Sequence, residues 1–220
     1  MTAREEMLAR IAAAIANTAP VVSEKLVSET ARGDGAARRE HGELTGTALL
    51  DLLSGRLTDY RAQVKRTARA TLAEAIATAL AGRGARRIVV PPGLDVPLPD
   101  WAEVTVDADG DRGLSPGELD SFDAVITRAA VAIAETGTII LDGSADQGRR
   151  AISLVPDYHL CIVGPEQVVQ LVPEAVARLA GSSRRPLTWI SGPSATSDIE
   201  LERVEGVHGP RTLEVILLAD

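Results

Sequence analysis

Short runs of apolar residues dominate the second half of the chain. They span residues 88–90, 104–106, 124–126, 139–141, 160–163, 187–190 and 213–218. Runs that are continuously apolar, rather than alternating with polar residues, are typical of parallel strands that are covered on both faces. The segments 148–154 and 166–180 between them are predicted to form helices. The pattern therefore predicts an α/β fold of three layers with a mostly parallel sheet.

The first part of the chain has a helical pattern and no predicted strand. Apolar residues at helical spacing predict an amphipathic helix over 3–16. A later repeat, with apolar residues at every fourth position, predicts one long helix over 57–81 that leads into the sheet. We therefore expect a helical leader, residues 1–84, packed on an α/β domain, residues 85–220, the two together forming a single structural unit.

The composition narrows the classes of partner. The formal net charge is −8, and the 23 basic residues are nearly all Arg, with Lys only at positions 25 and 65. A single-strand nucleic-acid binder needs a basic groove and stacking platforms, and this chain has five aromatic residues. No secretory signal is visible, and no apolar stretch approaches the ~20 residues of a membrane span. We therefore expect a cytoplasmic protein without a nucleic-acid partner or membrane span.

Cysteine and histidine usage limits the metal chemistry. Cys161 is the single cysteine, so these 220 residues hold no internal disulfide, Cys-rich zinc site or self-contained iron–sulfur cluster. Its apolar neighbours place it in a buried strand, where a lone Cys usually behaves as a small apolar residue. A catalytic thiol is the alternative. No His stands at metal-ligand spacing with another His or Cys, so we predict no metal and no cofactor in this chain.

A polar string immediately before the apolar run 139–141 is the first candidate site. It consists of Glu135, Thr136, Gly137 and Thr138. Gly137 lets the backbone approach a ligand closely, and Thr136 offers a neighbouring hydroxyl, so both are candidate binding residues. Glu135 is a candidate catalytic residue, because a carboxylate can act as nucleophile, base or acceptor. The alternative is an ordinary polar turn.

A second polar string, residues 191–200, follows the apolar run 187–190. Because ligands of open α/β sheets bind where the strands end, we expect it at the carboxyl edge of the sheet. A capping box at 197–200 predicts a helix start, whose free amide groups favour anions. The alternative is that its hydroxyl residues only cap that helix. Four residues of the string are candidates for binding an anionic group: Ser191, Gly192, Ser194 and Thr196.

A third candidate precedes the last apolar run. His208 stands in a turn rich in Gly and Pro, where an imidazole can act as acid, base or anion donor near neutral pH. We take His208 as a candidate catalytic residue, and Gly209 and Arg211 as candidate anion-binding residues. The alternative is a structural histidine beside a solvated arginine. His159, at the start of a strand, and His41, in a loop, are weaker candidates.

The three strings share one feature, which is that each borders a predicted strand through a loop of Gly, Pro or hydroxyl residues. We therefore expect Glu135, Ser194 and His208 to converge on one cleft at the carboxyl edge of the sheet, although they lie far apart in the sequence.

Residues 190–200 and 206–211 together resemble the signature of the LUD domain, specifically of the lactate utilisation protein C family. The string 135–138 and the stretch 153–159 resemble further segments of that family, and the likeness extends over most of the chain. One departure is Ser197, where Ala is commoner in the family.

The resemblance implies a fold like that of the NagB, ribose-phosphate isomerase and CoA-transferase group. It also implies a role in oxidising L-lactate to pyruvate, in a three-protein system whose other members are iron–sulfur proteins. Two functions stay open. In the first, the chain is a subunit that binds substrate, such as a small anionic metabolite, or a partner. In the second, it is a stand-alone transferase or ligase-like enzyme acting on a carboxylate or phosphorylated metabolite through Glu135, by analogy with the Glu nucleophile of CoA transferases.

Overall fold

The computed structural model describes residues 6–7, 10, 42–108, 113–182, 185–193, 195–196, 204–205 and 209–220. The chain divides into two compact units, residues 1–38 and 39–220. In the first unit Glu6, Met7 and Arg10 are helical, and the rest of the helix predicted over 3–16 lies outside the described residues. All strands of the described chain belong to the second unit.

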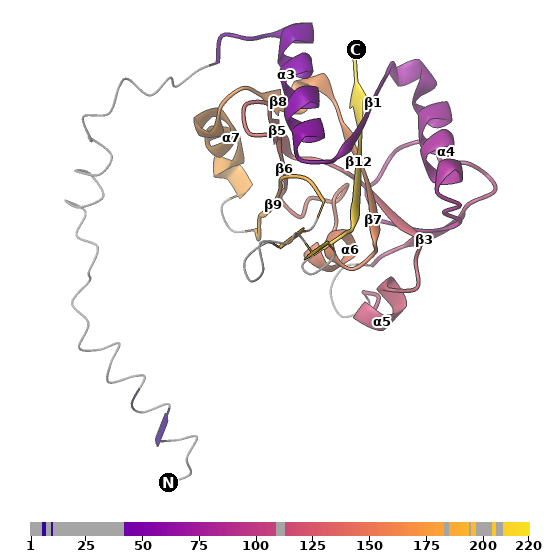
Figure 1. Ribbon diagram of the computed structural model, residues 1–220. Helices are drawn as coiled ribbons and strands as arrows, with labels where there is room; N and C mark the ends of the chain where they lie inside the picture. Colours follow the sequence, from indigo (N-terminus) through magenta and orange to yellow (C-terminus); the bar gives the residue numbers. More distant parts are fainter. Residues whose placement is uncertain are drawn as a thin grey trace. The chain divides into compact units, whose positions relative to one another are not determined.

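Six parallel strands form the main sheet, in the order β1–β12–β7–β4–β2–β3 (Figure 1). All six residues of β7 are buried, because neighbouring strands flank it on both sides and other elements cover both faces. The predicted α/β class with a mostly parallel sheet is confirmed. The strand bounds are Gln63–Thr67 (β1), Thr212–Leu218 (β12), Tyr158–Val163 (β7), Ala124–Arg128 (β4), Arg87–Val90 (β2) and Glu103–Val106 (β3).

A second, mainly antiparallel sheet has the order β8–β5–β6–β9, and a short hairpin joins β10 to β11. The apolar runs 139–141 and 187–190 were expected in the parallel sheet, and the structure places them here instead, as antiparallel neighbours. An apolar run reports burial and does not specify which sheet a strand joins. The bounds are Val168–Val169 (β8), Val131–Ile133 (β5), Thr138–Leu141 (β6), Thr188–Ile190 (β9), Ala195–Thr196 (β10) and Val204–Glu205 (β11).

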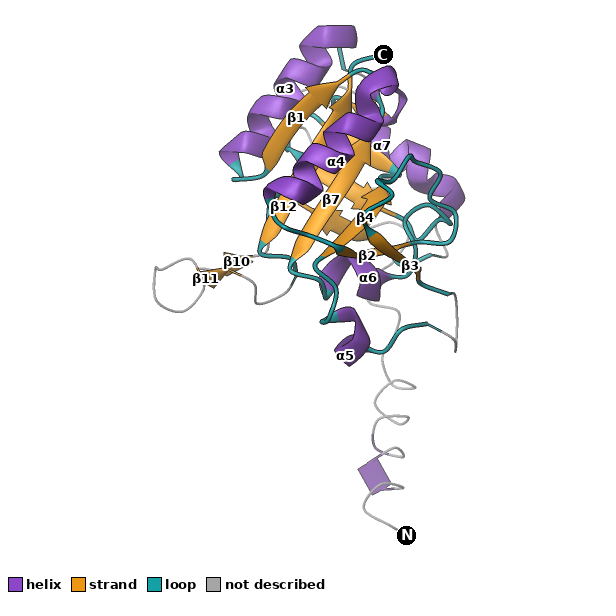
Figure 2. Ribbon diagram, turned by 90° about the vertical axis from the view of Figure 1, so that its right-hand side faces the viewer, coloured by secondary structure: helices purple, strands orange, loops and turns teal. Residues whose placement is uncertain are grey.

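Helices cover both faces of the main sheet (Figure 2). On one face α4, Leu72–Gly82, buries Ile76 and Leu80 against β4, β7 and β12. On the other face α3, Gly46–Asp59, buries Leu53 and Leu57, and the second sheet packs beside it. The outer face of the second sheet is covered in turn by α7, Val172–Leu179. The fold therefore contains two sheets where the sequence predicted one. The second sheet packs with α3 on one face of the main sheet, and α4 covers the other face.

Two short helices complete the cover of the main sheet. The helices α5, Pro116–Leu119, and α6, Arg150–Leu154, pack over Val89 and Val125. A capping box at Ser115 begins α5. Across the described residues, no helix is both long enough and apolar enough to cross a membrane. In the described part of the chain, 3-10 segments at Arg69–Thr71, Pro165–Gln167 and Ala180–Ser182 join larger elements.

The single helix predicted over 57–81 is wrong, because β1 separates α3 from α4. Arg61 adopts a left-handed backbone with φ 67°, and the amide of Ala62 donates to the carbonyl of Leu57 at 2.9 Å, which ends α3. The strand that follows is an edge strand with exposed charges, so it lacks the apolar run that marks a buried strand. Part of the predicted helical leader therefore lies within the sheet.

Two glycines bring loops of the second sheet against the carboxyl end of α3. Gly137 has φ 60°, and a Cβ at this position would lie 2.9 Å from the backbone carbon of Arg56. Gly192 has φ 82°, and its Cβ would lie 2.3 Å from the carbonyl oxygen of Tyr60. Both positions combine a left-handed backbone with a close backbone approach, so glycine is required at each for two reasons.

Gly137→Ala is therefore expected to lower the free energy of unfolding by about 2 kcal/mol, through backbone strain and overlap with α3. Gly55→Ala is the matched control, since Gly55 lies within α3 in open space. That variant is expected to raise stability by about 1 kcal/mol. Urea denaturation of both variants provides the measurement, and equal effects of the two substitutions would contradict the proposed packing.

Candidate functional site

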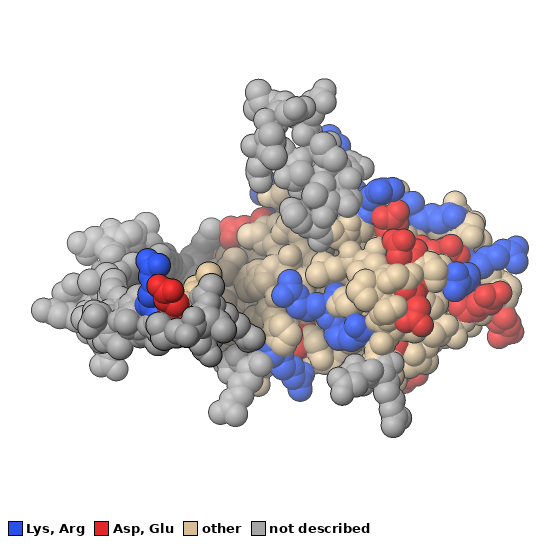
Figure 3. Space-filling view, turned by 90° about the horizontal axis from the view of Figure 1, so that it is seen from below, with Lys and Arg blue, Asp and Glu red and all other residues tan. Residues whose placement is uncertain are grey.

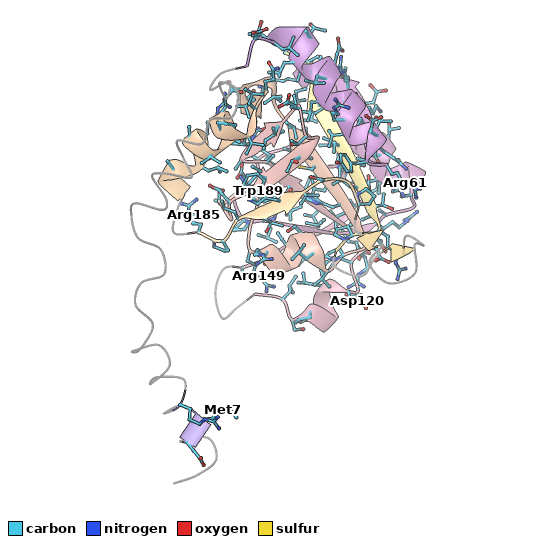
Figure 4. All side chains as sticks on the ribbon, turned by 60° about the vertical axis from the view of Figure 1, so that its left-hand side comes forward. Met7, Arg61, Asp120, Arg149, Arg185 and Trp189 are labelled. Atoms are coloured by element: carbon cyan, nitrogen blue, oxygen red, sulfur yellow. The ribbon has the colours of Figure 1, made fainter. Side chains whose placement is uncertain are left out.

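A cavity of about 250 Å³ lies where β7 and β12 begin. One wall comes from α6 and the other from β9 and the loop after it, and Figure 1 shows these elements at the same end of the main sheet. Figure 4 labels Trp189, which lies on β9, belongs to the lining and is 46% exposed. The lining consists of residues 153–154, 159, 188–193, 209–210 and 213.

The cavity lies at the amino edge of the main sheet, opposite to the expectation. The loop 191–193 does follow a strand, but that strand is β9 of the second sheet, which brings the loop beside the start of β7 and β12. The expected position at the carboxyl edge is therefore wrong. The rule that ligands bind at the carboxyl edge applies to strands of one open parallel sheet, and β9 is not part of one.

The carboxyl edge of β2, β3 and β4 is covered by the loop 142–149. The carbonyl of Ala145 accepts from the amide of Gly93 at 2.8 Å, and the carbonyl of Asp146 accepts from the amide of Arg128 at 3.1 Å. Arg149 binds the buried carboxylate of Asp107 through two nitrogens, at 2.6 and 2.9 Å, and this ion pair raises the pKa of the guanidinium. The charged groups at this edge are thus engaged with one another.

His159 is the deepest polar residue of the cavity lining, with an exposed fraction of 0%. Its Nε2 lies 2.8 Å from the hydroxyl of Thr127 on the neighbouring strand β4. Its Nδ1 has no hydrogen-bond partner within the described part of the chain. Buried side-chain nitrogens are nearly always paired, so an unpaired one in a cavity wall is a candidate ligand contact.

Burial sets the protonation of this region. It lowers the pKa of His159 to about 4, so the imidazole is neutral at pH 7. It raises the pKa of Cys161 to about 12, which keeps the thiol protonated. Cys161 packs against α3 in the apolar core, and Thr127 lies 3.9 Å from its sulfur. This is the setting of a buried structural cysteine rather than of a reactive thiolate.

Hydroxyl groups connect the first candidate string to the cavity loop. Thr138 lies 2.8 Å from the hydroxyl of Thr136 and 2.8 Å from the hydroxyl of Ser191. These contacts join β6 to the end of β9 and bring the two strings side by side. Glu135 is exposed and does not line the cavity. Gly137 lies against α3, as described above.

The structure assigns the remaining predicted site residues different positions. Ser191, Gly192 and Gly209 line the cavity. Arg211 is exposed, lies outside the cavity lining and forms an ion pair with Asp157 at 3.3 Å. Three further predictions concern Ser194 and His208, which lie outside the described residues, and Thr196, of which only the backbone in β10 is described. The helix predicted to begin at the 197–200 capping box also lies outside them.

A second polar cluster lies on the opposite face of the sheet. The Tyr158 hydroxyl donates to the carboxylate of Glu214 at 2.8 Å, and the guanidinium of Arg83 lies 4.7 Å from the centre of the tyrosine ring. Burial and the charge of Glu214 raise the pKa of Tyr158. These three groups pair with one another, so the cluster ties β7 and β12 to the end of α4 without leaving an unpaired atom.

The cavity lining holds no acidic or basic side chain among the residues that the structure describes. Figure 3 views the molecule from below, the end where β7 and β12 begin, and shows Lys or Arg side chains interspersed with uncharged surface there. No group of three or more His, Cys, Asp or Glu suited to a metal ion occurs in the described ranges. The site therefore offers hydroxyls, backbone groups, one neutral imidazole and apolar surface.

The sequence alone made His159 a weaker candidate, whereas the structure places it in the cavity lining with an unpaired nitrogen. The usable signal was its place one residue before a wholly apolar run, 160–163. Because side chains alternate along a strand, a histidine there faces the same side as Cys161 and Val163 and has no route to water. The sequence did not show that Thr127 is the hydrogen-bond partner of His159, or that a cavity lies beside the imidazole.

The neutral state of His159 makes stability depend on pH. The imidazole titrates at about 4 in the folded chain and near 6.5 when unfolded, so between these values only the unfolded chain binds a proton. Stability is therefore lost as pH falls through this window, by about 2 kcal/mol at pH 5. We expect His159→Phe to remove this component in urea denaturation between pH 7.5 and 5. Parallel pH profiles for the two proteins would contradict a neutral buried His159.

Comparison with known proteins places the chain in a family. Residues 108–218 match the family described as the LUD domain. Lactate utilization protein C of Deinococcus radiodurans is 53% identical over 178 residues, which cover 80% of this chain and 82% of that protein. The protein of the same name from Halalkalibacterium halodurans is 29% identical over 231 residues, which cover 99% of this chain and 98% of that protein.

A solved structure agrees with this assignment. The crystal structure of a DUF162 family protein from Deinococcus radiodurans matches with a TM-score of 0.69 and 48% sequence identity. The match covers 80% of this chain and 99% of that chain, so it includes nearly all of the neighbour's fold. The predicted resemblance is thereby confirmed: this chain belongs to the lactate utilization protein C family and carries a LUD domain.

Proposed function

We propose that this protein acts in the oxidation of L-lactate to pyruvate, as a subunit that binds a metabolite or a partner while iron–sulfur partner proteins carry the electrons. Relatives that match most of the chain are named for lactate utilization, which supports the role. The observation that carries the binding part is the cavity at His159, whose unpaired Nδ1 is suited to a ligand.

The chemistry of the reaction explains the need for partners. Conversion of L-lactate to pyruvate removes two electrons and two protons, and an acceptor must take the electrons. Iron–sulfur clusters are held by several thiolates, usually four. The sequence has one cysteine, and burial keeps the Cys161 thiol protonated. The clusters that the family resemblance implies therefore belong to other chains.

The small anionic metabolite remains a proposal for the loop that begins at Ser191. Ser194 and His208, which the sequence assigns to it, lie outside the described residues. Ser191 and Gly209 support a binding role at the solvent-accessible part of the cavity lining, where Ser191 is exposed and Gly209 is half-buried. Arg211 supports it less, since its guanidinium is already paired with Asp157 at the surface.

The alternative function, a transferase or ligase-like enzyme acting through Glu135, has no comparable support. A carboxylate nucleophile acts best beside a bound substrate in a site that excludes water. The Glu135 side chain is exposed, and it does not line the cavity. Its likeness to the nucleophile of CoA transferases is an analogy at the level of fold.

Deletion of the gene for this protein, in the bacterium that carries it, tests the role in lactate oxidation. We expect the deletion strain to lose growth on L-lactate and to grow normally on pyruvate, because only the step between the two is blocked. A plasmid copy of the wild-type gene is expected to restore growth. Unimpaired growth of the deletion strain on L-lactate would overturn the proposed role.

Glu135→Gln separates the two functions. If the protein is a subunit that binds through the cavity, Glu135 is not needed for its function. The Glu135→Gln variant is then expected to restore growth of the deletion strain on L-lactate to within about twofold of wild type. The substitution removes a charge at the surface and is expected to change stability by less than about 0.5 kcal/mol. Loss of complementation by a folded, normally expressed variant would favour the enzyme that acts through Glu135.

A further inference from the structure

The cavity at His159 has a chemical character that the anion prediction does not match. Among the described residues its lining is without charge. Burial holds the His159 imidazole neutral at pH 7, so it supplies no positive charge either. A buried carboxylate or phosphate without a countercharge loses far more solvation than neutral hydrogen bonds return. The interior of the cavity therefore favours an uncharged ligand.

The size of the cavity sets a limit on that ligand. An apolar protein cavity of about 150 Å³ holds one benzene ring. At about 250 Å³, this cavity has room for one ring with small substituents. A three-carbon acid would fill only part of it and would leave apolar wall without contact.

The walls are suited to a ring. Leu154, Ile190 and Leu213 supply apolar surface from three different elements. Trp189 contributes to the lining from β9, but it pairs with Ile140, which faces α7, so its indole ring lies on the other face of that strand. A ring in the cavity therefore gains mainly from burial against the three apolar side chains.

The ligand also needs a polar group that can form a hydrogen bond with Nδ1 of His159. Its Nε2 is engaged with the Thr127 hydroxyl, and that hydroxyl can donate or accept. Nδ1 is accordingly an acceptor in one tautomer and a donor in the other. A hydroxyl group satisfies both cases, because it carries one donor and two acceptor positions.

We infer that the cavity binds an uncharged ring compound bearing a hydroxyl group, of the phenol class, with the hydroxyl oxygen hydrogen-bonded to Nδ1 of His159. This inference goes beyond the proposed role in L-lactate oxidation, because it names the chemical class of the metabolite that the cavity takes, and neither L-lactate nor pyruvate belongs to that class.

Tryptophan fluorescence tests the inference directly. The chain has two tryptophans, Trp101 and Trp189, and only the second lines the cavity. In a Trp101→Phe background, the emission of Trp189 therefore reports occupancy. The probes are p-cresol and p-xylene, which have nearly the same shape and differ by a hydroxyl in place of a methyl group. Excitation is set where neither probe absorbs.

The measured quantity is the ratio of the p-xylene to the p-cresol dissociation constant. We expect His159→Phe to lower this ratio about tenfold, because it removes the nitrogen that pairs with the hydroxyl. His159→Asn retains a polar amide near the position of Nδ1 and is expected to keep most of the preference. Circular dichroism verifies folding, and the Asn variant decides the matter if the Phe variant does not fold.

Three results would overturn the inference. The first is an unchanged ratio in the folded His159→Phe protein, which would show that the hydroxyl does not contact the imidazole. The second is the absence of p-cresol binding, shown by no Trp189 response and no heat of binding in isothermal titration calorimetry. The third is displacement of p-cresol by L-lactate or pyruvate with a loss of their affinity in His159→Phe, which would make the cavity an anion site. We expect neither acid to displace p-cresol.

Discussion

Complete burial of β7 is the constraint on which the rest of the structure depends. The strand is paired on both sides and covered on both faces, so each of its six side chains must be accommodated without water. Leu160 and Ile162 pack toward α4, and Cys161 and Val163 toward α3. The two polar residues at its start, Tyr158 and His159, must find partners inside the protein. Tyr158 finds one for its only polar atom, whereas His159 finds one for the first of its two nitrogens.

How much of the fold could be predicted depends on what an apolar run reports. The runs at β7 and β12 were located correctly because both strands are buried on two faces, and burial leaves a direct trace in composition. The edge strand β1 was missed because it carries two charged residues, a half-buried Lys65 and an exposed Arg66, and a helical repeat nearby extended across it. The runs at β6 and β9 were found but assigned to the wrong sheet, since strand direction is decided by long-range pairing that no local window contains.

The candidate site shows the same division between local and long-range information. Gly137 was singled out as a residue that permits close approach to a ligand, and the structure shows a close approach to Arg56 of the chain itself. Ser191 and Gly209 were candidates in two separate strings, and the structure places both in the lining of one cavity. The edge itself was predicted wrongly because β9 was taken for a strand of the main sheet. His159 was underrated because its importance comes from an unpaired atom, which only the three-dimensional arrangement reveals.

An unpaired nitrogen in a closed core is costly, on the order of 1–3 kcal/mol, and an apolar ring of similar size would avoid that cost. In this fold the unpaired nitrogen belongs to a residue of a cavity wall. A ligand that forms a hydrogen bond with this nitrogen can regain the free energy that the missing partner costs. The same burial that creates the cost also removes charge from the imidazole, and it places the hydrogen bond in surroundings of low polarity, where a matched partner is strongly preferred over a mismatched one. For the ligand class inferred above, selection at this cavity depends on the fit of donor and acceptor positions rather than on electrostatic attraction. In this respect the cavity differs from the exposed Arg211–Asp157 pair at the same end of the sheet, whose charges are already solvated and screened.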